Sequence, residues 1–292
     1  MKLLLLSPAP ALAAPAAPLA LASTLSLGQR AGRLLQQLHQ GSPALAWAGW
    51  LHVGLALLAA ALLFFDPRLL TGAPVWAKPL KFALADGLFC WTMAVLLLGL
   101  PAAARPAVAA IGWGVALSMM VETVIIFVQA GRGQPSHYNV SSALNAALFA
   151  TMGIFILVNT LCSLWAVYVV WRYPLPGPAA YGWGVRLGLP LSVLGALVGG
   201  LMIRQLAHTV GAPDGGPGLP GLGWSTRAGD VRAAHFLGLH AVQALPLLGW
   251  ALGRGVPASA TVLTWLGAGL YLAAAAALLA QALAGQPLWR GR

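Results

Sequence analysis

Several ionisable side chains of this sequence lie inside stretches that are otherwise apolar. Glu122 follows Gly114 and Ser118 and precedes Gln129, at spacings of four, four and seven residues. In a helix this spacing places all four on one face. An ionisable group inside a membrane helix costs roughly 2.5–3.5 kcal/mol on insertion scales, so its presence points to a function. Glu122 is therefore a candidate for proton exchange or ligand binding.

Cationic and imidazole side chains occur near the ends of other apolar stretches. Gly200, Arg204 and His208 are spaced by four residues, so in a helix Arg204 and His208 are expected to project together. An arginine binds carboxylate or phosphate through two parallel hydrogen bonds, and an imidazole exchanges a proton near neutral pH. The further candidates of this kind are Lys81, Asp86, Arg232 and His235.

All these groups are expected to meet at one level. If consecutive stretches cross the bilayer in alternate directions, they fall in the half opposite the N-terminus, beneath a Gly/Pro-rich loop from Gly211 to Asp230. His137, in the loop after Gly131, lies on the same side. The pattern predicts a shared polar pocket with this long loop as a lid. The alternatives are a disordered loop and interhelical hydrogen bonds that serve assembly, worth about 0.6 kcal/mol each.

The charge balance of the predicted pocket indicates the charge of its ligand. Lys81, Arg204 and Arg232 outnumber Glu122 and Asp86, so a small anionic or zwitterionic solute is expected. The chain shows no nucleophile elbow, triad spacing or phosphate-binding loop, and no catalytic residue is assigned. We therefore expect binding, sensing or transport of a solute rather than an enzyme.

The histidines leave a redox function open as the alternative. A haem between two helices needs one imidazole from each at matching depth, and His52 and His240 both lie near mid-membrane. A metal ion held by Glu122, His208 and His235 is the other possibility. No HxxxH, HExxH or CxxC motif accompanies these residues, so no cofactor is the first expectation and haem the second.

The composition excludes a soluble domain. Of the 292 residues, 60% are hydrophobic and 7% are charged, whereas soluble domains have roughly 45–50% and roughly 25%. The net charge of +11 is the balance of 16 basic and 5 acidic residues, and the basic residues are scattered over short loops. Without a basic stripe or interleaved aromatics, this charge favours lipid headgroups as the partner and not nucleic acid.

Seven stretches are long enough to cross the hydrocarbon layer, which needs about 20 apolar residues. Because backbone amides cannot stay unpaired in lipid, each should be helical. The sequence thus predicts an all-α polytopic bundle over residues 44–284, with a basic tail at 285–292. The predicted helices are Ala44–Phe65, Phe82–Leu100, Ala107–Ala130, Ala143–Trp171, Val185–Val210, Val231–Leu252 and Ala260–Ala284.

The first 43 residues are rich in Ala and Pro. Met1-Lys2 and the leucines after it are similar to the start of a signal peptide, but four prolines interrupt the apolar run. An unstructured leader is therefore expected. Lys and Arg divide seven to nine between the two sides of the membrane. Once the residues assigned to the polar site are set aside, the side of the N-terminus is expected to be cytoplasmic.

Three segments of the chain resemble an uncharacterised family of bacterial multi-pass membrane proteins. The resemblance covers about Lys78 to Trp250 and implies the membrane class and a bacterial inner membrane; it transfers no activity and no catalytic residue. The segments are KPLKF at Lys78–Phe82, ETVIIFVQAGRGQPSHYN at Glu122–Asn139, and the stretch His208–Trp250.

Overall fold

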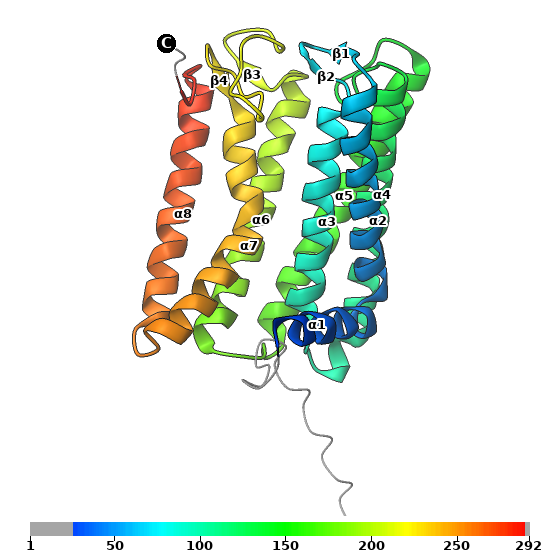
Figure 1. Ribbon diagram of the computed structural model, residues 1–292. Coiled ribbons are helices and arrows are strands. Elements are labelled where there is room, and N and C mark those ends of the chain that lie inside the picture. Colours follow the sequence, from blue (N-terminus) through cyan, green and yellow to red (C-terminus); the bar gives the residue numbers. More distant parts are fainter. Residues whose placement is uncertain (1–25, 290–292) are drawn as a thin grey trace, which may run out of the picture.

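The structure, a computed structural model, describes residues 26–289 of the chain. This part folds into an all-α bundle whose long helices run side by side (Figure 1). The helices are α1 (Leu27–Gly41), α2 (Pro43–Phe65), α3 (Ala77–Leu97), α4 (Arg105–Gly131), α5 (Ala143–Arg172), α6 (Ala179–Gln205), α7 (Val231–Gly255) and α8 (Ala260–Leu283), with a 3₁₀ turn η1 (Ala102–Ala104). Two short antiparallel ribbons, β1 (Leu69–Leu70) with β2 (Ala73–Pro74) and β3 (Thr209–Val210) with β4 (Gly229–Asp230), lie at the end opposite α1.

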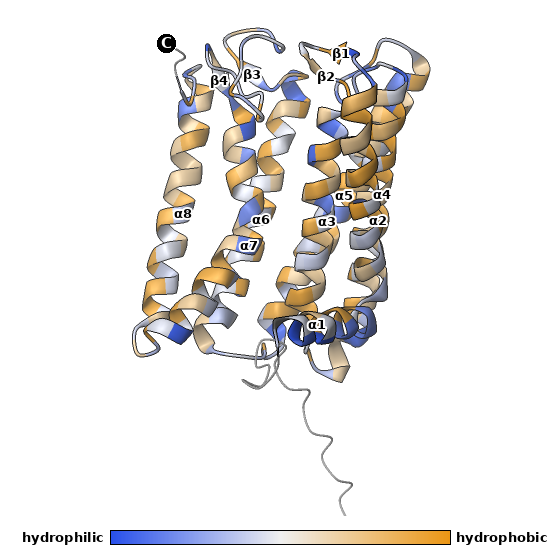
Figure 2. Ribbon diagram, viewed as in Figure 1, coloured by the Kyte–Doolittle hydropathy of each residue, from blue (hydrophilic) through white to orange (hydrophobic). Residues whose placement is uncertain are grey.

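The helices α2 to α8 are each long and apolar enough to cross a membrane, which confirms the seven predicted spans. Their outward faces carry large exposed apolar side chains, among them Leu57, Ile154, Leu197, Leu247 and Leu270. Figure 2 shows that hydrophobic residues predominate along the long helices. Soluble proteins rarely expose so much contiguous apolar surface to water. The chain is a multi-pass membrane protein whose sides contact lipid.

Several helix ends differ from the expected ones, and two of the differences affect the candidate site. The predicted helix from Phe82 begins at Ala77, so Lys78 and Lys81 lie in its first turns. The predicted helix ending at Val210 stops at Gln205, because Leu206 takes the left-handed conformation with φ 52° and its N–H bonds back into the last turn. His208 therefore lies outside the helix. The prediction that Arg204 and His208 project from one helical face is wrong.

The expectation that residues 1–43 are unstructured is wrong for the helix α1. Ser26 caps α1 with a capping box, in which its hydroxyl accepts from the N–H of Gln29 and the Gln29 side chain bonds back to the N–H of Ser26. Leu38 is buried in the bundle, and Leu34 packs against the same core. The helix lies across the end of the bundle in Figure 1. Residues 1–25 of the predicted leader and 290–292 of the tail lie outside the described residues.

Glycines form the contact between α6 and α7. A Cβ on Gly184 would lie 2.3 Å from the Leu245 carbonyl oxygen, and one on Gly195 would lie 2.4 Å from the Gly238 carbonyl carbon. Backbone therefore touches backbone along this pair, the packing that small residues permit between membrane helices. The two helices hold each other in a fixed register.

Apolar and polar cores occupy different halves of the bundle. The largest apolar cluster includes Leu45, Met93, Ile111, Val169 and Leu189 and lies in the half nearer α1. The buried acidic residues Glu122 and Asp230 belong to the other half, nearer the two ribbons. That half contains the candidate site.

Candidate functional site

The centre of the site is the carboxyl of Glu122 on α4. The loop between α4 and α5 brings His137 back to it, with Nε2 of His137 3.3 Å from Oε1 of Glu122. On the other side of the ring, Lys78 Nζ and Ser136 Oγ each lie 3.1 Å from Nδ1. An ammonium can only donate, so Nδ1 is the bare nitrogen and the Nε2–H donates to Glu122. The ring of His137 thus joins Lys78 on α3 to Glu122 on α4.

The second carboxyl oxygen of Glu122 has no hydrogen-bond partner among the described residues. The side chain is 4% exposed, and this second oxygen, Oε2, is buried. A buried carboxyl oxygen without a donor is costly. One oxygen of the carboxyl therefore lacks a donor among the described residues.

Aromatic rings enclose His137. Phe82, Tyr138 and Phe149 have ring centroids 5.6, 5.8 and 6.4 Å from the imidazole. Burial, with Lys78 and His235 nearby, holds the pKa of His137 well below its usual range. His137 is thus neutral at pH 7, in keeping with a bare Nδ1.

His208 extends the site toward the long loop. Its ring stacks edge-on against Tyr138 at 5.1 Å, and its Nδ1 lies 2.6 Å from Oδ2 of Asp214. Burial and the nearby Arg232 lower the pKa of His208 to about 4, although Asp214 opposes them. Burial alone would raise the pKa of Asp214, but hydrogen bonds from Thr209 and from backbone N–H groups lower it to about 2. At neutral pH the contact is therefore a hydrogen bond from a neutral imidazole to a carboxylate.

His235 approaches the same centre from α7. Its Nδ1 lies 2.7 Å from the carbonyl oxygen of Gly195 on α6, which fixes the ring proton on Nδ1 because a carbonyl only accepts. Gly199 leaves room for this ring, since a Cβ there would lie 3.1 Å from Cε1. The electrostatic influence of His235 on His137 places the two imidazoles in one neighbourhood.

The long loop is folded over this region. β3 and β4 close its base, Gly218 bridges to Ser225, and Trp224 packs on Phe236 with centroids 5.6 Å apart. We call residues 211–228 the lid. Its tip approaches Lys81, whose Nζ is 3.4 Å from the carbonyl oxygens of Gly221 and Leu222.

Arg232 anchors the lid. Its guanidinium makes two bonds to Asp230, of 2.9 and 2.6 Å, and a third of 2.7 Å to the Gly223 carbonyl oxygen. Asp230 is 3% exposed and also accepts from the N–H of Ser225 at 2.8 Å. The hydrogen bonds of the Arg232 guanidinium therefore mainly hold the lid in place. The Lys81 ammonium, with two long contacts, is the freer cation.

Arg204 is not brought into this cluster. It is exposed in the last turn of α6, and it makes no hydrogen bond or ion pair with the described part of the chain. The early end of α6 at Leu206 separates it from His208. Asp86 is brought in: it is an electrostatic neighbour of Glu122 and accepts a 2.7 Å bond from Thr123.

Part of the predicted polar level joins helices rather than lining the site. Gln129 Nε2 donates to Asn145 Oδ1 at 3.1 Å, and Arg132 donates to both side chains. This network ties the end of α4 to the start of α5. For Gln129, Arg132 and Asn145, the alternative of interhelical hydrogen bonds that serve assembly therefore applies.

Metal-ligating side chains do not gather in threes in the part of the chain that the structure describes. Among residues 26–289, no group of three His, Cys, Asp or Glu side chains could hold a metal ion, so Glu122, His208 and His235 do not form one. Both ring nitrogens of His52 are engaged, by Ala48 and Thr123. The Nδ1 of His240 faces Gln243 at 3.2 Å.

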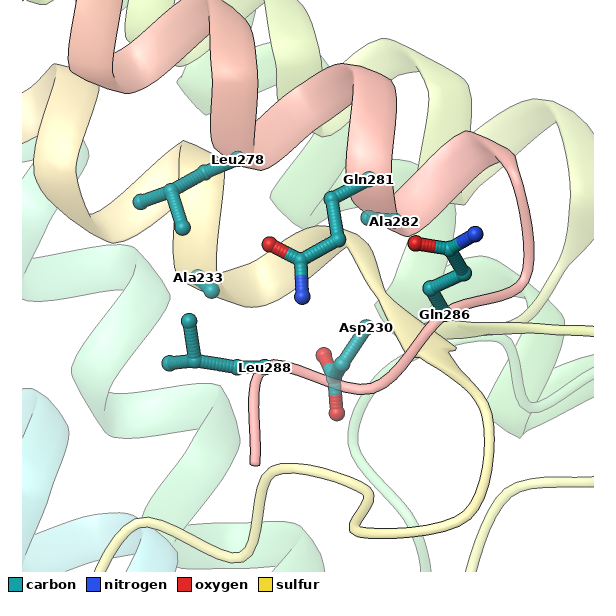
Figure 3. Close-up of a pocket in the computed structure, with 7 residues that line it drawn as sticks. All are labelled: Asp230, Ala233, Leu278, Gln281, Ala282, Gln286 and Leu288. Atoms are coloured by element: carbon teal, nitrogen blue, oxygen red, sulfur yellow. The ribbon is translucent and has the colours of Figure 1, made fainter. Parts of the chain in front are cut away.

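Two small cavities lie beside the polar cluster rather than in it. One, of about 10 Å³, sits between the start of α7 and the end of α8, where Asp230, Gln281 and Gln286 converge (Figure 3). It has room for about one water molecule. The other, of about 150 Å³, is an apolar space among α6, α7 and α8. Neither is lined by Glu122 or His137.

Two residues of the centre, Lys78 and His137, were not among the predicted site residues. Lys78 could have been found from its spacing of three residues from Lys81 at a helix start. No periodic signal marks His137, because a loop carries it back into the bundle. Comparisons with protein-family models, with curated proteins and with solved structures found no match to this chain.

Proposed function

We propose that the protein binds a small anionic or zwitterionic solute beneath the lid, to sense or transport it. The buried, unpartnered Oε2 of Glu122 carries this proposal. An open acceptor at this depth calls for a donor that the described residues do not supply.

A zwitterion suits both signs of charge in the site. Its ammonium group would donate to Oε2 of Glu122, and its carboxylate would face the Lys81 ammonium. Lys81 makes only two contacts of 3.4 Å to lid carbonyls, so an anionic group could replace them at little cost. The solute would thus bind between α3, α4 and the lid, with Asp86, His208, Arg232 and His235 around it.

Access to this position requires movement of the lid. Its tip is held by Lys81 and by the bond from Arg232 to the Gly223 carbonyl. A carboxylate that binds Lys81 would release the first contact. Binding and lid position are thereby coupled, which a receptor and a carrier both need.

We further propose a bacterial inner membrane as the location, with the N-terminal side cytoplasmic. The gathering of the acidic residues toward the lid end supports this orientation. The solute would then enter the site from the periplasmic side.

The test is thermal unfolding of the detergent-purified protein with a panel of amino acids and small carboxylates. A solute at 100 times its Kd should stabilise the protein by about 2.7 kcal/mol. We expect this stabilisation to be lost in Glu122→Gln and reduced in Lys81→Gln. Arg204→Gln is the matched control, because Arg204 is exposed outside the cluster and should leave the response unchanged.

Two results would contradict the proposal. One is the absence of stabilisation by every zwitterion and anion in the panel. The other is a response that Arg204→Gln abolishes and Glu122→Gln leaves intact, which would move the site to the end of α6.

A further inference from the structure

A second group of polar side chains lies beside Glu122, on three neighbouring helices. His52 on α2, Thr123 on α4 and Asp86 on α3 form one continuous chain of hydrogen bonds. Thr123 Oγ1 lies 2.7 Å from Oδ2 of Asp86 and 3.1 Å from Nε2 of His52, and His52 Nδ1 lies 2.7 Å from the Ala48 carbonyl oxygen. Both His52 and Thr123 are fully buried.

The packing of three helices is adapted to this chain. Gly87 follows Asp86 on α3, and a Cβ there would lie 2.9 Å from the Cβ of His52. Only a glycine lets α2 approach closely enough for the His52 ring to reach Thr123 on the third helix. Three membrane spans thus meet at one hydroxyl.

The number of protons limits the arrangements that this row of hydrogen bonds can adopt. The Ala48 carbonyl only accepts, so His52 Nδ1 always carries a proton. The Thr123 hydroxyl has one proton and lies between two groups that can each donate or accept. If it donates to Asp86, then His52 Nε2 must donate to it; if it donates to Nε2, then Asp86 must donate to it.

Only two arrangements therefore use every contact. In the first, the protonated Asp86 carboxyl donates to Thr123, and Thr123 donates to the bare Nε2 of a neutral His52. In the second, the Asp86 carboxylate accepts from Thr123, and Thr123 accepts from the Nε2–H of an imidazolium. The first becomes the second when the Asp86 proton moves to Oγ1 and the Thr123 proton moves to Nε2, with no change in the total number of protons.

We propose that His52, Thr123 and Asp86 form an intramembrane proton-transfer site that holds one mobile proton. The threonine hydroxyl passes the proton between carboxyl and imidazole.

Other ionisable groups set the boundaries of the site. Cys90, on α3, and Glu122, on α4, are the electrostatic neighbours of Asp86 in the described part of the chain. Glu122 connects in turn to His137, whose side chain is 20% exposed. We therefore expect a proton from the lid side to exchange with Asp86 by way of Glu122 and His137. The inference does not depend on the solute proposed above, because it rests on hydrogen bonds within the protein.

The test is solid-state NMR of the full-length protein in lipid bilayers, with ¹⁵N-labelled histidine rings. The His52 signals are assigned by their loss in His52→Gln. In the wild type, Nδ1 should be protonated throughout and Nε2 should show both the bare and the protonated form. Asp86→Asn has no proton to give and should remove the protonated Nε2 signal completely.

Variants at the hydroxyl separate transfer from simple proximity. Thr123→Val should also remove the protonated form, and Thr123→Ser, which restores a hydroxyl, should recover it even if the valine variant folds poorly. Thr160→Val is the matched control, because the Thr160 hydroxyl bonds only to the Ile156 carbonyl of its own helix, among the described contacts. A wild-type Nε2 that stays in one form, or two forms that persist in Asp86→Asn, would overturn the proposal.

Discussion

Replacing Gly195 on α6 by alanine tests whether the α6–α7 contact is as close as the structure has it. The new Cβ would lie 2.4 Å from the Gly238 carbonyl carbon and 2.5 Å from the Leu239 nitrogen. Carbon atoms in contact are about 3.5–4.0 Å apart, so the helices must separate by about 1 Å. All the atoms involved are backbone, and none can rotate away.

The magnitude follows from two opposed effects. Overpacking of a tight contact costs about 1–3 kcal/mol, whereas alanine in place of glycine within a helix gains about 0.5–1 kcal/mol. Gly200 provides the matched control on the same helix, since a Cβ there has nothing within 4 Å. Both substitutions carry the same helix-propensity gain, so the difference between them isolates the overpacking cost.

The assay is reversible unfolding in mixed detergent micelles, followed by tryptophan fluorescence. Gly195→Ala should be less stable than Gly200→Ala by about 1–3 kcal/mol, and Gly200→Ala should equal or exceed the wild type. Equal stability of the two variants would refute the reasoning. It would mean that α6 and α7 are further apart than described.

Three further predictions concern the lid and α1. The pKa of His208 is about 4 in the folded protein and about 6.5 when unfolded, so between these pH values the unfolded chain binds more protons than the folded one. The midpoint of thermal unfolding should therefore fall as the pH drops from 6.5 to 4. It should fall less in His208→Asn. Asp230→Asn leaves the partly exposed Arg232 without its carboxylate and should cost about 2 kcal/mol, measured by the same unfolding assay; an unchanged midpoint would count against the anchoring role. Ser26→Ala removes the cap of α1 and should cost that helix about 1 kcal/mol, seen as faster hydrogen exchange confined to residues 27–41.

The helices were the most predictable part of the fold. Their number follows from the length of apolar segments that a bilayer demands, and the structure has all seven. The end of α6 was not predictable in the same way. Leu206 takes a conformation usually reserved for glycine, so nothing in the local sequence signalled that His208 leaves the helix.

The position of each candidate residue along its helix was predictable from the sequence, but the direction in which its side chain points was not. Glu122 and Asp86 lie at the expected level because their positions along the helices fix it. Arg204 has the expected level too, yet it faces outward, since helix rotation depends on packing that one sequence does not reveal. His137 was missed as a central residue because a loop delivers it, and α1 because an Ala/Pro-rich average concealed a readable capping signal at Ser26 and Gln29.

The division of the bundle into a polar half and an apolar half bears on the choice between carrier and receptor. The cluster around Leu45, Met93 and Leu189 lies between the polar groups and the α1 face, and most of its side chains are aliphatic. A carrier would have to part these side chains in every cycle, whereas a receptor could leave them closed and use them as a rigid base. Widening this barrier with smaller residues should therefore alter turnover in a carrier and leave ligand affinity in a receptor untouched.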